Sequence, residues 1–378
     1  MQRTTDVVIV GGGIIGCAIA YFLQKRGINV TVLEETAIGK QSSSAAVGLL
    51  APIRPLSSQS DPFKALQLAS LARFRSLIPE LEALSGIETR YEQTGALRVL
   101  PVEKIEPVRT WSDEWNQMGF HCELLSPEET YRREPLLFPG LAGALFIAEE
   151  AQVSPAHLVK AYAQGARELG AAFFEHAKVV AFQQSGDRIT GVSTNKGDVF
   201  LCHQLILATG VWSAECGKQL GISFPVRPVR GEVLAVQQPS TPIRHIFFDE
   251  GVFDEDICLA PKPDNTIWIS GTKKDVGMDT SVSVGGVLHL LTILSRLFPA
   301  LVDCRIQRMW AGLRPKTPEN RPLIGPAPQW ANVTLASGHG AFGILLSAIT
   351  GELVAECIET GDLPEMLRPF APKEPVSE

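Results

Sequence analysis

The sequence predicts a mixed fold class, α/β plus α+β. We expect a domain with a mostly parallel sheet to be interleaved with a second domain built on an antiparallel sheet. The chain has 378 residues, the size of two to three ordinary domains. It opens with an apolar strand, a run of glycines, a helix and a second strand, an order typical of parallel crossovers. Strand-rich runs then interrupt the α/β segments, which indicates that one domain is threaded through the other.

The elements of the first half follow from hydrophobic periodicity and end signals. Residues 6–10 are an all-apolar, β-branched run of the kind buried on both faces of a parallel sheet. From 14 to 26 apolar residues recur at helical spacing up to a Lys-Arg-Gly stop, and 28–35 is a strand that ends in acid. The same signals predict helices at 62–84, 102–118 and 154–169 and a strand at 95–100.

The second half is richer in strands. Turns at 185–187 and 195–197 separate short strands that close on the run 205–210. Residues 226–271 are again strand-like, and the first part of this stretch predicts a long strand. A last strand at 333–337 leads through a glycine-rich turn into a closing helix at 342–360.

Composition excludes several classes of protein. The 34 basic and 41 acidic residues give a net charge of −7, the wrong sign for general binding of nucleic acid or an anionic membrane. With 45% hydrophobic residues the chain has material for a large core. Its 33 glycines exceed the roughly 26 expected from average usage, so their positions carry information.

The cysteines and the apolar runs point to a soluble cytoplasmic protein. No Cys-x-x-Cys pair or Cys/His cluster at zinc spacing occurs, which argues against a disulfide scaffold and a metal site. The apolar run 7–23 lacks a basic leader and is broken by glycines, so it is not a signal peptide. The run 287–302 is too short for a membrane span and contains His289, Arg296 and Pro299.

The glycine run after the first strand has the spacing of a dinucleotide-binding motif. Gly11 allows the tight turn, Gly13 lets the backbone approach a pyrophosphate, and Gly16 lets helix and strand pack closely. The phosphates then meet the free N–H groups at the helix N-terminus. Glu34, at the end of the second strand, is placed to accept hydrogen bonds from a ribose diol and disfavours NADP. Further small-residue clusters at 205–212 and 338–343 suit a long cofactor, so FAD fits better than NAD.

Eight segments give the chain a specific resemblance over essentially its full length. They are 8–20, 42–50, 153–158, 208–213, 228–233, 310–315, 321–326 and 338–347. With these segments the chain resembles the D-amino acid oxidase superfamily of flavoproteins, most closely its glycine oxidase branch linked to thiamine biosynthesis. We accordingly expect a Rossmann-like FAD-binding domain from 1–85, 150–222 and 310–378, and a substrate-binding domain from 86–149 and 223–309.

The motif and the resemblance together predict the cofactor-binding positions. These are Gly11, Gly13, Ile14, Ile15, Gly16, Glu34, Glu35, Ser42, Ser43, Val47, Gly48, Leu49, Val179, Gly210, Gly338, His339, Gly340, Ala341, Phe342, Gly343, Ile344 and Leu345. Some relatives attach the flavin to a cysteine shortly after the Leu-Arg-Pro motif. This chain has Thr317 and Pro318 there, so we expect non-covalent FAD.

The resemblance places the substrate carboxylate on Arg314. A guanidinium offers a planar fork that matches a carboxylate, so we expect this role, against the alternative of a structural arginine that pairs with a backbone carbonyl or with Glu319. Two positions depart from the family: Ala341 replaces an arginine and Cys258 replaces a tyrosine. Arg54 is a candidate for the replacement charge, against the alternative of an ordinary solvated arginine.

Other side chains near the motifs have weaker cases. His339 is expected to offer its backbone to the flavin rather than to act as a base. Lys273 and Lys274 are candidates for a cation that assists oxygen, against a solvated turn, and His245 and Asp249 are candidates to face substrate. We therefore expect no acid or base catalyst.

The function implied by the resemblance is FAD-dependent oxidation of a small amino acid: glycine, sarcosine or a D-amino acid. Hydride passes to flavin N5, the imine is hydrolysed, and O2 is reduced to H2O2. Alternatives are a secondary-amine, proline or D-amino acid dehydrogenase with another electron acceptor, an NAD-dependent dehydrogenase, and a flavin-binding subunit without turnover. Relatives are often dimers or tetramers, so a homo-oligomer is expected.

Overall fold

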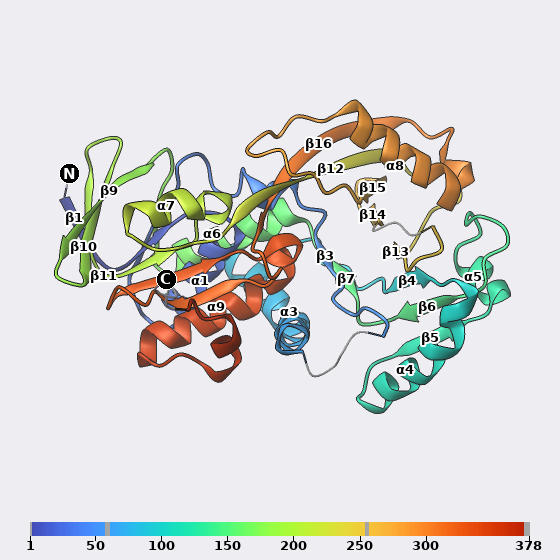
Figure 1. Ribbon diagram of the computed structural model, residues 1–378, viewed down its shortest axis with the longest axis horizontal. Coiled ribbons are helices and arrows are strands. Elements are labelled where there is room, and N and C mark those ends of the chain that lie inside the picture. Colours follow the sequence, from blue (N-terminus) through green and yellow to red (C-terminus); the bar gives the residue numbers. More distant parts are fainter. Residues whose placement is uncertain (1, 57–60, 254–256, 374–378) are drawn as a thin grey trace, which may run out of the picture.

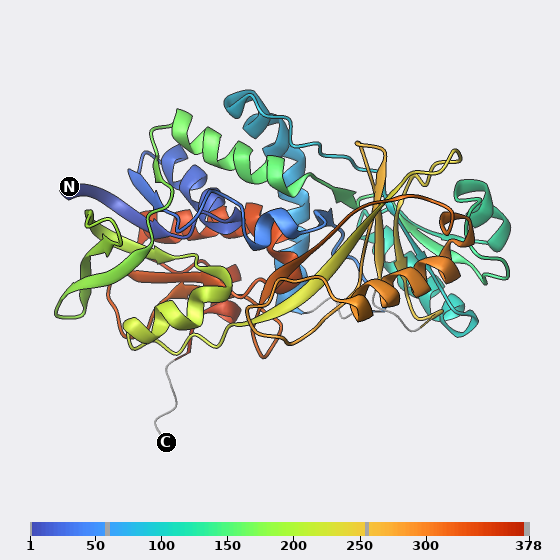
Figure 2. The same ribbon diagram turned by 90° about the horizontal axis from the view of Figure 1, so that it is seen from above.

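The computed structural model describes residues 2–56, 61–253 and 257–373. It has two lobes along its long axis, one with α1, α9 and β1 and the other with α4, α8 and β4 (Figure 1). Strands β12 (Arg227–Gln237) and β16 (Ile306–Lys316) run together from one lobe into the other, as Figure 2 shows from above. This pair of strands is the continuous connection between the lobes at which the site forms.

The first lobe is built on a sheet that has eight strands within the described residues. β1 pairs in parallel with β2 and β11, β2 with β8, and β11 with β18. The β9–β10 hairpin and β17 extend this parallel centre by antiparallel pairing. The strands are β1 Gln2–Val10, β2 Val30–Leu33, β8 Ala172–Phe174, β9 Val179–Ser185, β10 Arg188–Thr194, β11 Val199–Leu207, β17 Leu323–Pro326 and β18 Val333–Ser337.

Strand β1 shows why both faces of this sheet are covered. Val7 and Ile9 pack into the core formed with α1, α3, α6 and α9, whereas Val8 and Val10 pack into the opposite core beneath β9 and β10. Each such burial contributes on the order of 1.5–3 kcal/mol, which explains the all-apolar run. The helices of this lobe are α1 Ile14–Lys25, α2 Ser42–Ala45, α3 Pro62–Ser85, α6 Pro155–Glu168, α7 Ser213–Gln219 and α9 Gly343–Thr360.

Helix α9 owes its apolar composition to burial. The segment Gly340–Thr360 is long and apolar enough to cross a membrane by length and composition alone. In the structure it packs against α1 and α3, and 61% of its most apolar window is buried. Ser70 of α3 donates a hydrogen bond to the Leu345 carbonyl inside this contact. These are the properties of a central helix in a protein core.

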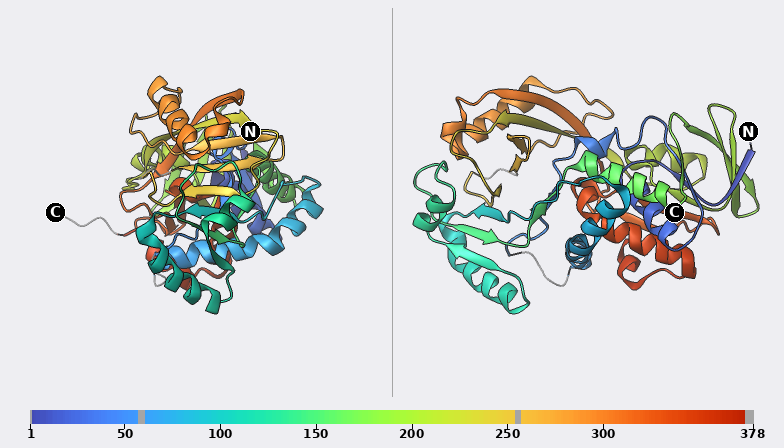
Figure 3. Two further views of the ribbon diagram at one scale, coloured as in Figure 1. Left: turned by 90° about the vertical axis from the view of Figure 1, so that its right-hand side faces the viewer. Right: turned by 180° about the vertical axis from the view of Figure 1, so that it is seen from behind.

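The second lobe holds another sheet of eight strands within the described residues, in the order β16-β12-β15-β14-β13-β4-β6-β5. Its neighbours are antiparallel except for β13 and β4, which are parallel. Helix α8 covers β12 and β15 on one face, and α4 covers β5 and β6 (Figure 3). The elements are β4 Ala96–Val99, α4 Ile105–Gln117, β5 Cys122–Leu125, α5 Pro127–Arg133, β6 Ala144–Ile147, β13 Ile246–Asp249, β14 Cys258–Lys262, β15 Thr266–Ser270 and α8 Val284–Leu297, and a two-stranded sheet pairs β3 Leu49–Leu50 with β7 Ala151–Gln152.

The predicted fold class is confirmed, although several elements, among them α5, α7, β5, β6 and β17, were not predicted. Helix α8 was not predicted, because two glycines in its first turn weaken the helical signal; Ser283 caps it by accepting from the Gly286 N–H. Strand β16 runs continuously across residue 310, where the sequence placed a domain boundary. The boundaries themselves stay a prediction.

The packing of Gly16 generates a first prediction. A Cβ atom at Gly16 would lie 2.0 Å from the Gly11 carbonyl oxygen, so Gly16→Ala forces helix α1 away from the loop. We expect the free energy of unfolding to fall by about 1–3 kcal/mol, measured by urea denaturation. Gly285→Ala is the matched control, since a Cβ there has no neighbour within 4 Å. Equal stability of the Gly16 variant and wild type would contradict the packing role.

Candidate functional site

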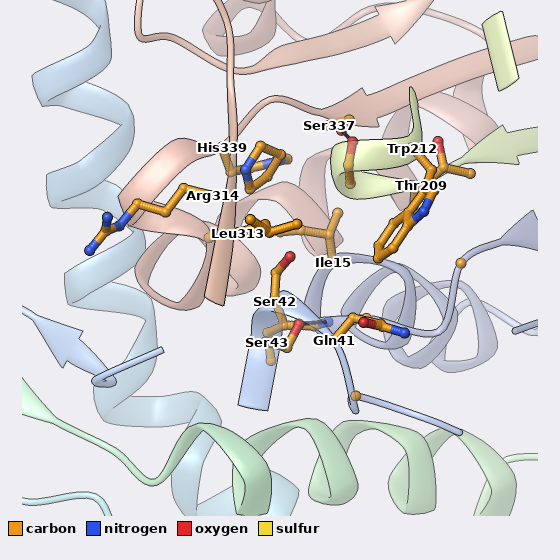
Figure 4. Close-up of a pocket in the computed structure, with 18 of the residues that line it drawn as sticks. Ile15, Gln41, Ser42, Ser43, Thr209, Trp212, Leu313, Arg314, Ser337 and His339 are labelled. Atoms are coloured by element: carbon orange, nitrogen blue, oxygen red, sulfur yellow. Dashed lines mark hydrogen bonds between the residues drawn. The ribbon is translucent and has the colours of Figure 1, made fainter. Parts of the chain in front are cut away.

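A cavity of about 330 Å³ lies where the two lobes meet. Its walls come from the carboxyl ends of β1, β2 and β11 in the first sheet and from β12, β14 and β16 in the second. Ligands of open α/β sheets bind at this edge. Figure 4 shows Thr209, Trp212 and Gln41 grouped on one side of the cavity, with Arg314 extending on the opposite side, beyond His339.

The glycine loop brings the N-terminus of α1 to the cavity. Gly11 has a φ of 110°, and a Cβ there would lie 2.4 Å from the Ala208 carbonyl oxygen. Ser43 Oγ accepts a hydrogen bond from the Ile14 N–H at 2.9 Å. Within the described residues the N–H groups of Gly13 and Ile15 donate to no protein atom. The loop therefore presents free donors, as an anion-binding helix N-terminus does.

Glu34 occupies the end of the cavity beyond this loop. It is 9% exposed, and its carboxylate accepts from the Gly12 N–H at 2.8 Å and from the Thr36 N–H and hydroxyl at 2.8 and 2.9 Å. A carboxylate has about four lone-pair positions, so Glu34 retains capacity for one more donor. The Glu34 carboxylate thus holds the loop and also lines the cavity. Glu35 lies beside it and pairs with Lys178 at 3.0 Å.

Arg314 lies at the other end, on β16. Its Nη1 donates to the Thr272 carbonyl at 3.0 Å and its Nη2 to Ser270 Oγ at 3.5 Å. The guanidinium lies over Gly231, where a Cβ would come within 2.1 Å of Nη1. No carboxylate of the described residues forms an ion pair with Arg314, and the pairing with Glu319 considered from the sequence is not among its contacts. Burial lowers the pKa of Arg314, which disfavours leaving this cation without an anion.

Two small side chains accompany Arg314 in the cavity wall. Cys258 Sγ lies 3.5 Å from the Ser270 carbonyl, and burial raises the pKa of its thiol to about 11, so the thiol is neutral. Ala341 lines the cavity from the short 3-10 turn that precedes α9. Neither residue supplies a charge, so Arg314 is the charged group of this trio.

His339 is buried and bonded away from the cavity. It is 3% exposed, and its Nε2 lies 3.2 Å from the Thr350 hydroxyl. Burial lowers the pKa of His339 to about 3, which keeps the imidazole neutral. A neutral imidazole already paired with α9 is a poor general base.

The structure brings most of the predicted cofactor positions together in one wall. Eighteen of them line the cavity: Gly11, Gly13, Ile14, Ile15, Glu34, Glu35, Ser42, Ser43, Val47, Gly48, Leu49, Val179, Gly210, His339, Gly340, Ala341, Gly343 and Ile344. Four lie outside it: Gly16 in the first turn of α1, Gly338 in a turn with a φ of 77°, and Phe342 and Leu345 in the packing of the core. Their side of the loop and helix faces the protein interior.

The weaker candidates lie outside the cavity wall. Arg54, Lys273 and Lys274 are exposed. The pKa of Lys273 is lowered mainly by partial desolvation of its ammonium and in addition by the charges of Arg54 and Arg314. His245 pairs with Glu134 at 2.6 Å, and Asp249 accepts from the Val252 and Phe253 N–H groups.

Several lining residues were not predicted individually. They include Gln41, Thr209, Trp212, Gly231, Ser270 and Ser337. Thr209 and Trp212 belong to the Ala-Thr-Gly-Val-Trp-Ser run that follows β11, so a position just after a parallel strand was the available signal. Gly231 and Ser270 carry no such signal, because only the pairing of β12, β15 and β16 brings them to Arg314.

Comparison with known proteins agrees with this geometry. The profile of the DAO family, described as FAD dependent oxidoreductase, matches residues 6–357. The chain belongs to the DAO family. It is 31% identical over 358 residues to the glycine oxidase of Bacillus subtilis (strain 168), covering 95% of this chain and 94% of the relative. It is 33% identical over 374 residues to the glycine oxidase of Geobacillus kaustophilus (strain HTA426), covering 98% and 97%.

A solved structure of this kind supports the arrangement of the lobes. The crystal structure of glycine oxidase from Geobacillus kaustophilus matches with a TM-score of 0.90 at 31% identity, covering 99% of this chain and all of that chain (100%). Membership in the DAO family makes FAD the cofactor. The site fits it: Gly11 leaves no side chain in the way, Gly13 and Ile15 offer free N–H donors, and Glu34 stands at the ribose end.

The buried His339 of this DAO-family protein generates a second prediction. Below about pH 6.5 the unfolded chain binds a proton at His339, whereas the folded protein does not until about pH 3. This contribution to stability is complete above pH 6.5 and is lost as the pH falls through that window. Its slope is at most about 1.4 kcal/mol per pH unit.

We therefore expect the unfolding free energy of His339→Gln to fall less steeply than that of wild type between pH 6 and pH 4. Urea denaturation of the FAD-loaded protein at several pH values measures this. The control is His203→Gln, because the His203 side chain is 75% exposed. Parallel curves for wild type and His339→Gln would contradict the prediction.

Proposed function

We propose that this protein is an FAD-dependent oxidase of a small amino acid: glycine, sarcosine or a D-amino acid. The C–N bond is oxidised to an imine, water hydrolyses the imine to a 2-oxo acid and ammonia or an amine, and O2 is reduced to H2O2. The similarity to two glycine oxidases, which extends over nearly the full length of the chain, supports this function over a dehydrogenase or a subunit without turnover. It also leaves no reason to prefer an NAD-dependent enzyme, since the family uses FAD.

The observation that carries the proposal is the setting of Arg314. This guanidinium reaches the cavity from β16 and donates hydrogen bonds to two neutral acceptors, Thr272 O and Ser270 Oγ. Its remaining N–H donors offer a carboxylate a charged, planar partner. We therefore assign Arg314 to the carboxylate of the amino acid, with Cys258 and Ala341 as the small neighbours that leave room for its Cα substituents.

The described residues act by orientation rather than by proton transfer. FAD, when bound, supplies the hydride acceptor. A substrate whose amine is neutral can lose hydride from its Cα without a side-chain base, because the nitrogen lone pair forms the imine. The neutral Cys258 thiol and the neutral His339 imidazole agree with this assignment. Holding the carboxylate on Arg314 fixes the Cα–H bond relative to the flavin, and such positioning accounts for a large share of catalysis in oriented reactions.

We propose that FAD is held without a covalent bond. Thr317 and Pro318 follow the Leu-Arg-Pro motif, and the thiol of Cys258, which does line the cavity, stays protonated at neutral pH. A protonated thiol is a weak nucleophile. Precipitation with acid is expected to release all of the flavin into the supernatant.

We also propose a cytoplasmic homo-oligomer, a dimer or tetramer. The seven cysteines are all free, as in a reducing compartment. Val284 and Leu288 of α8 are 87% and 63% exposed, and Met309 on the neighbouring edge strand β16 is 45% exposed. Exposed apolar side chains on a helix and on an edge strand are typical of a subunit contact.

The substrate test is anaerobic reduction of the bound flavin. Purified protein is mixed with glycine, sarcosine, L-proline and a series of D- and L-amino acids, and the flavin absorbance is followed. We expect bleaching by at least one small amino acid, and H2O2 on admitting air. Flavin that dithionite reduces but no amino acid bleaches would reject the proposed function; bleaching without peroxide would identify a dehydrogenase.

If Arg314 binds the substrate carboxylate, its removal should lower activity with the amino acid without lowering the FAD content. Removing a desolvated charge partner costs about 2–5 kcal/mol, so Arg314→Ala should lower kcat/KM by more than tenfold at unchanged FAD content. Gly231→Ala should act in the same direction, because its Cβ displaces the guanidinium while leaving it in the chain. Gly285→Ala is again the matched control. Wild-type kinetics in a yellow, folded Arg314→Ala variant would reject the assignment.

A further inference from the structure

A buried lysine holds one peptide of the cavity wall from behind. Val47, Gly48 and Leu49 line the cavity in succession. Lys262, the last residue of β14, does not line it; its Nζ donates to the Val47 carbonyl at 2.7 Å. Lys262 therefore lies on the far side of the wall and contacts the peptide that joins Val47 to Gly48.

The direction of that peptide follows from its planarity. No cis peptide occurs in the described residues, so the Val47 carbonyl and the Gly48 N–H point in opposite directions. The carbonyl points at Lys262, and the N–H therefore points toward the cavity. Within the described part of the chain the Gly48 N–H donates to no protein atom. A buried amide without a partner costs about 1–3 kcal/mol of folding free energy, so we infer that this N–H donates to a bound ligand.

This peptide lies at the Arg314 end of the cavity. Trp310 Nε1 donates to the Ala45 carbonyl at 3.0 Å, and a Cβ at Gly312 would meet the Ala45 side chain at 2.5 Å. The segment leading to Val47 is thus packed on β16 two residues before Arg314. Because the adenosine end of the cavity is at Glu34, the redox-active ring of FAD belongs at the end that Val47 and Gly48 share with Arg314.

Lys262 is held in place by a second contact. Its Nζ also donates to Gln152 Oε1 at 2.7 Å, and Gln152 Nε2 donates to the Pro261 carbonyl at 2.6 Å and to Glu92 at 3.1 Å. The Trp268 ring lies 5.0 Å from Nζ. Burial lowers the pKa of Lys262 to about 8, which leaves the ammonium charged at neutral pH. A cation on a carbonyl polarises the whole peptide and strengthens its N–H as a donor.

We propose that Lys262 is a positioning residue for the cofactor: it orients and polarises the Val47–Gly48 peptide so that the Gly48 N–H donates to the FAD ring. Such a donor stabilises the electron-rich reduced ring more than the oxidised one. Lys262 thereby raises the reduction potential and tightens FAD binding. The proposal depends on FAD, which follows from the family, and not on which amino acid is oxidised.

The test measures the flavin and needs no substrate. The midpoint potential is determined at pH 7 by slow enzymatic reduction against a reference dye, and the FAD dissociation constant by titration of the apoprotein. Lys262→Met removes the charge and the donor, Lys262→Gln keeps a neutral donor, and Lys262→Arg keeps both. Lys160→Met removes an equal charge from an exposed position of α6 and is the control.

We expect Lys262→Met to have a more negative potential than wild type and an FAD dissociation constant about tenfold higher. Lys262→Gln should fall between the two in potential, and Lys262→Arg and Lys160→Met should match wild type. If Lys262→Met does not fold, the comparison of Lys262→Gln with Lys262→Arg decides. A wild-type potential in Lys262→Met or Lys262→Gln, or an equal shift in Lys262→Arg, would overturn the proposal, because packing alone would then account for Lys262. The potential is measured without any amino acid. If no amino acid reduced the flavin, the proposed function would fail, but the test of Lys262 would still stand.

Discussion

The antiparallel pairing of β12 with β16 is the interaction on which the site depends. The ladder runs from Arg227 opposite Lys316 to Val236 opposite Ile306, and it places Gly231 opposite Gly312. These two glycines open space for neighbours: Gly312 for Ala45 of the cofactor segment, and Gly231 for the guanidinium of Arg314. Because both spaces belong to one ladder, the Arg314 guanidinium and the segment that contains Ala45 are held at a fixed distance from each other.

Burial decides which side chains of the site carry charge. It raises the pKa of Cys258 and lowers that of His339, so both are neutral at pH 7. It also lowers the pKa values of Arg314 and Lys262, but their usual pKa values are so high that both remain charged. The same low-polarity surroundings thus keep Cys258 and His339 neutral and leave two cations, Arg314 in the cavity wall and Lys262 behind it.

Much of the fold followed from the sequence, because its signals are local. The strand 6–10, the glycine loop and helix α1 succeed one another within a short stretch, and each is stabilised by its own periodicity or by a turn that needs glycine. The glycine loop that lines the cavity could be located for the same reason, as could Glu34 at the end of the next strand. Helix α8 could not, because its two early glycines mask a helix that packing on β12 and β15 stabilises.

The sequence by itself determined the nucleotide-binding half, the class of cofactor and the candidate Arg314. Only the tertiary structure decided what surrounds them. The hydrogen bond of Lys262 to Val47 joins residues 215 positions apart, and the guanidinium of Arg314 lies over Gly231 on a neighbouring strand. Contacts between residues so far apart in the sequence leave no periodic or spacing signal in a single sequence, since they arise from the registers of several strands at once. The glycine loop that lines the cavity is therefore encoded by neighbouring residues, whereas the contacts of Lys262 and Arg314 come from the assembled sheets.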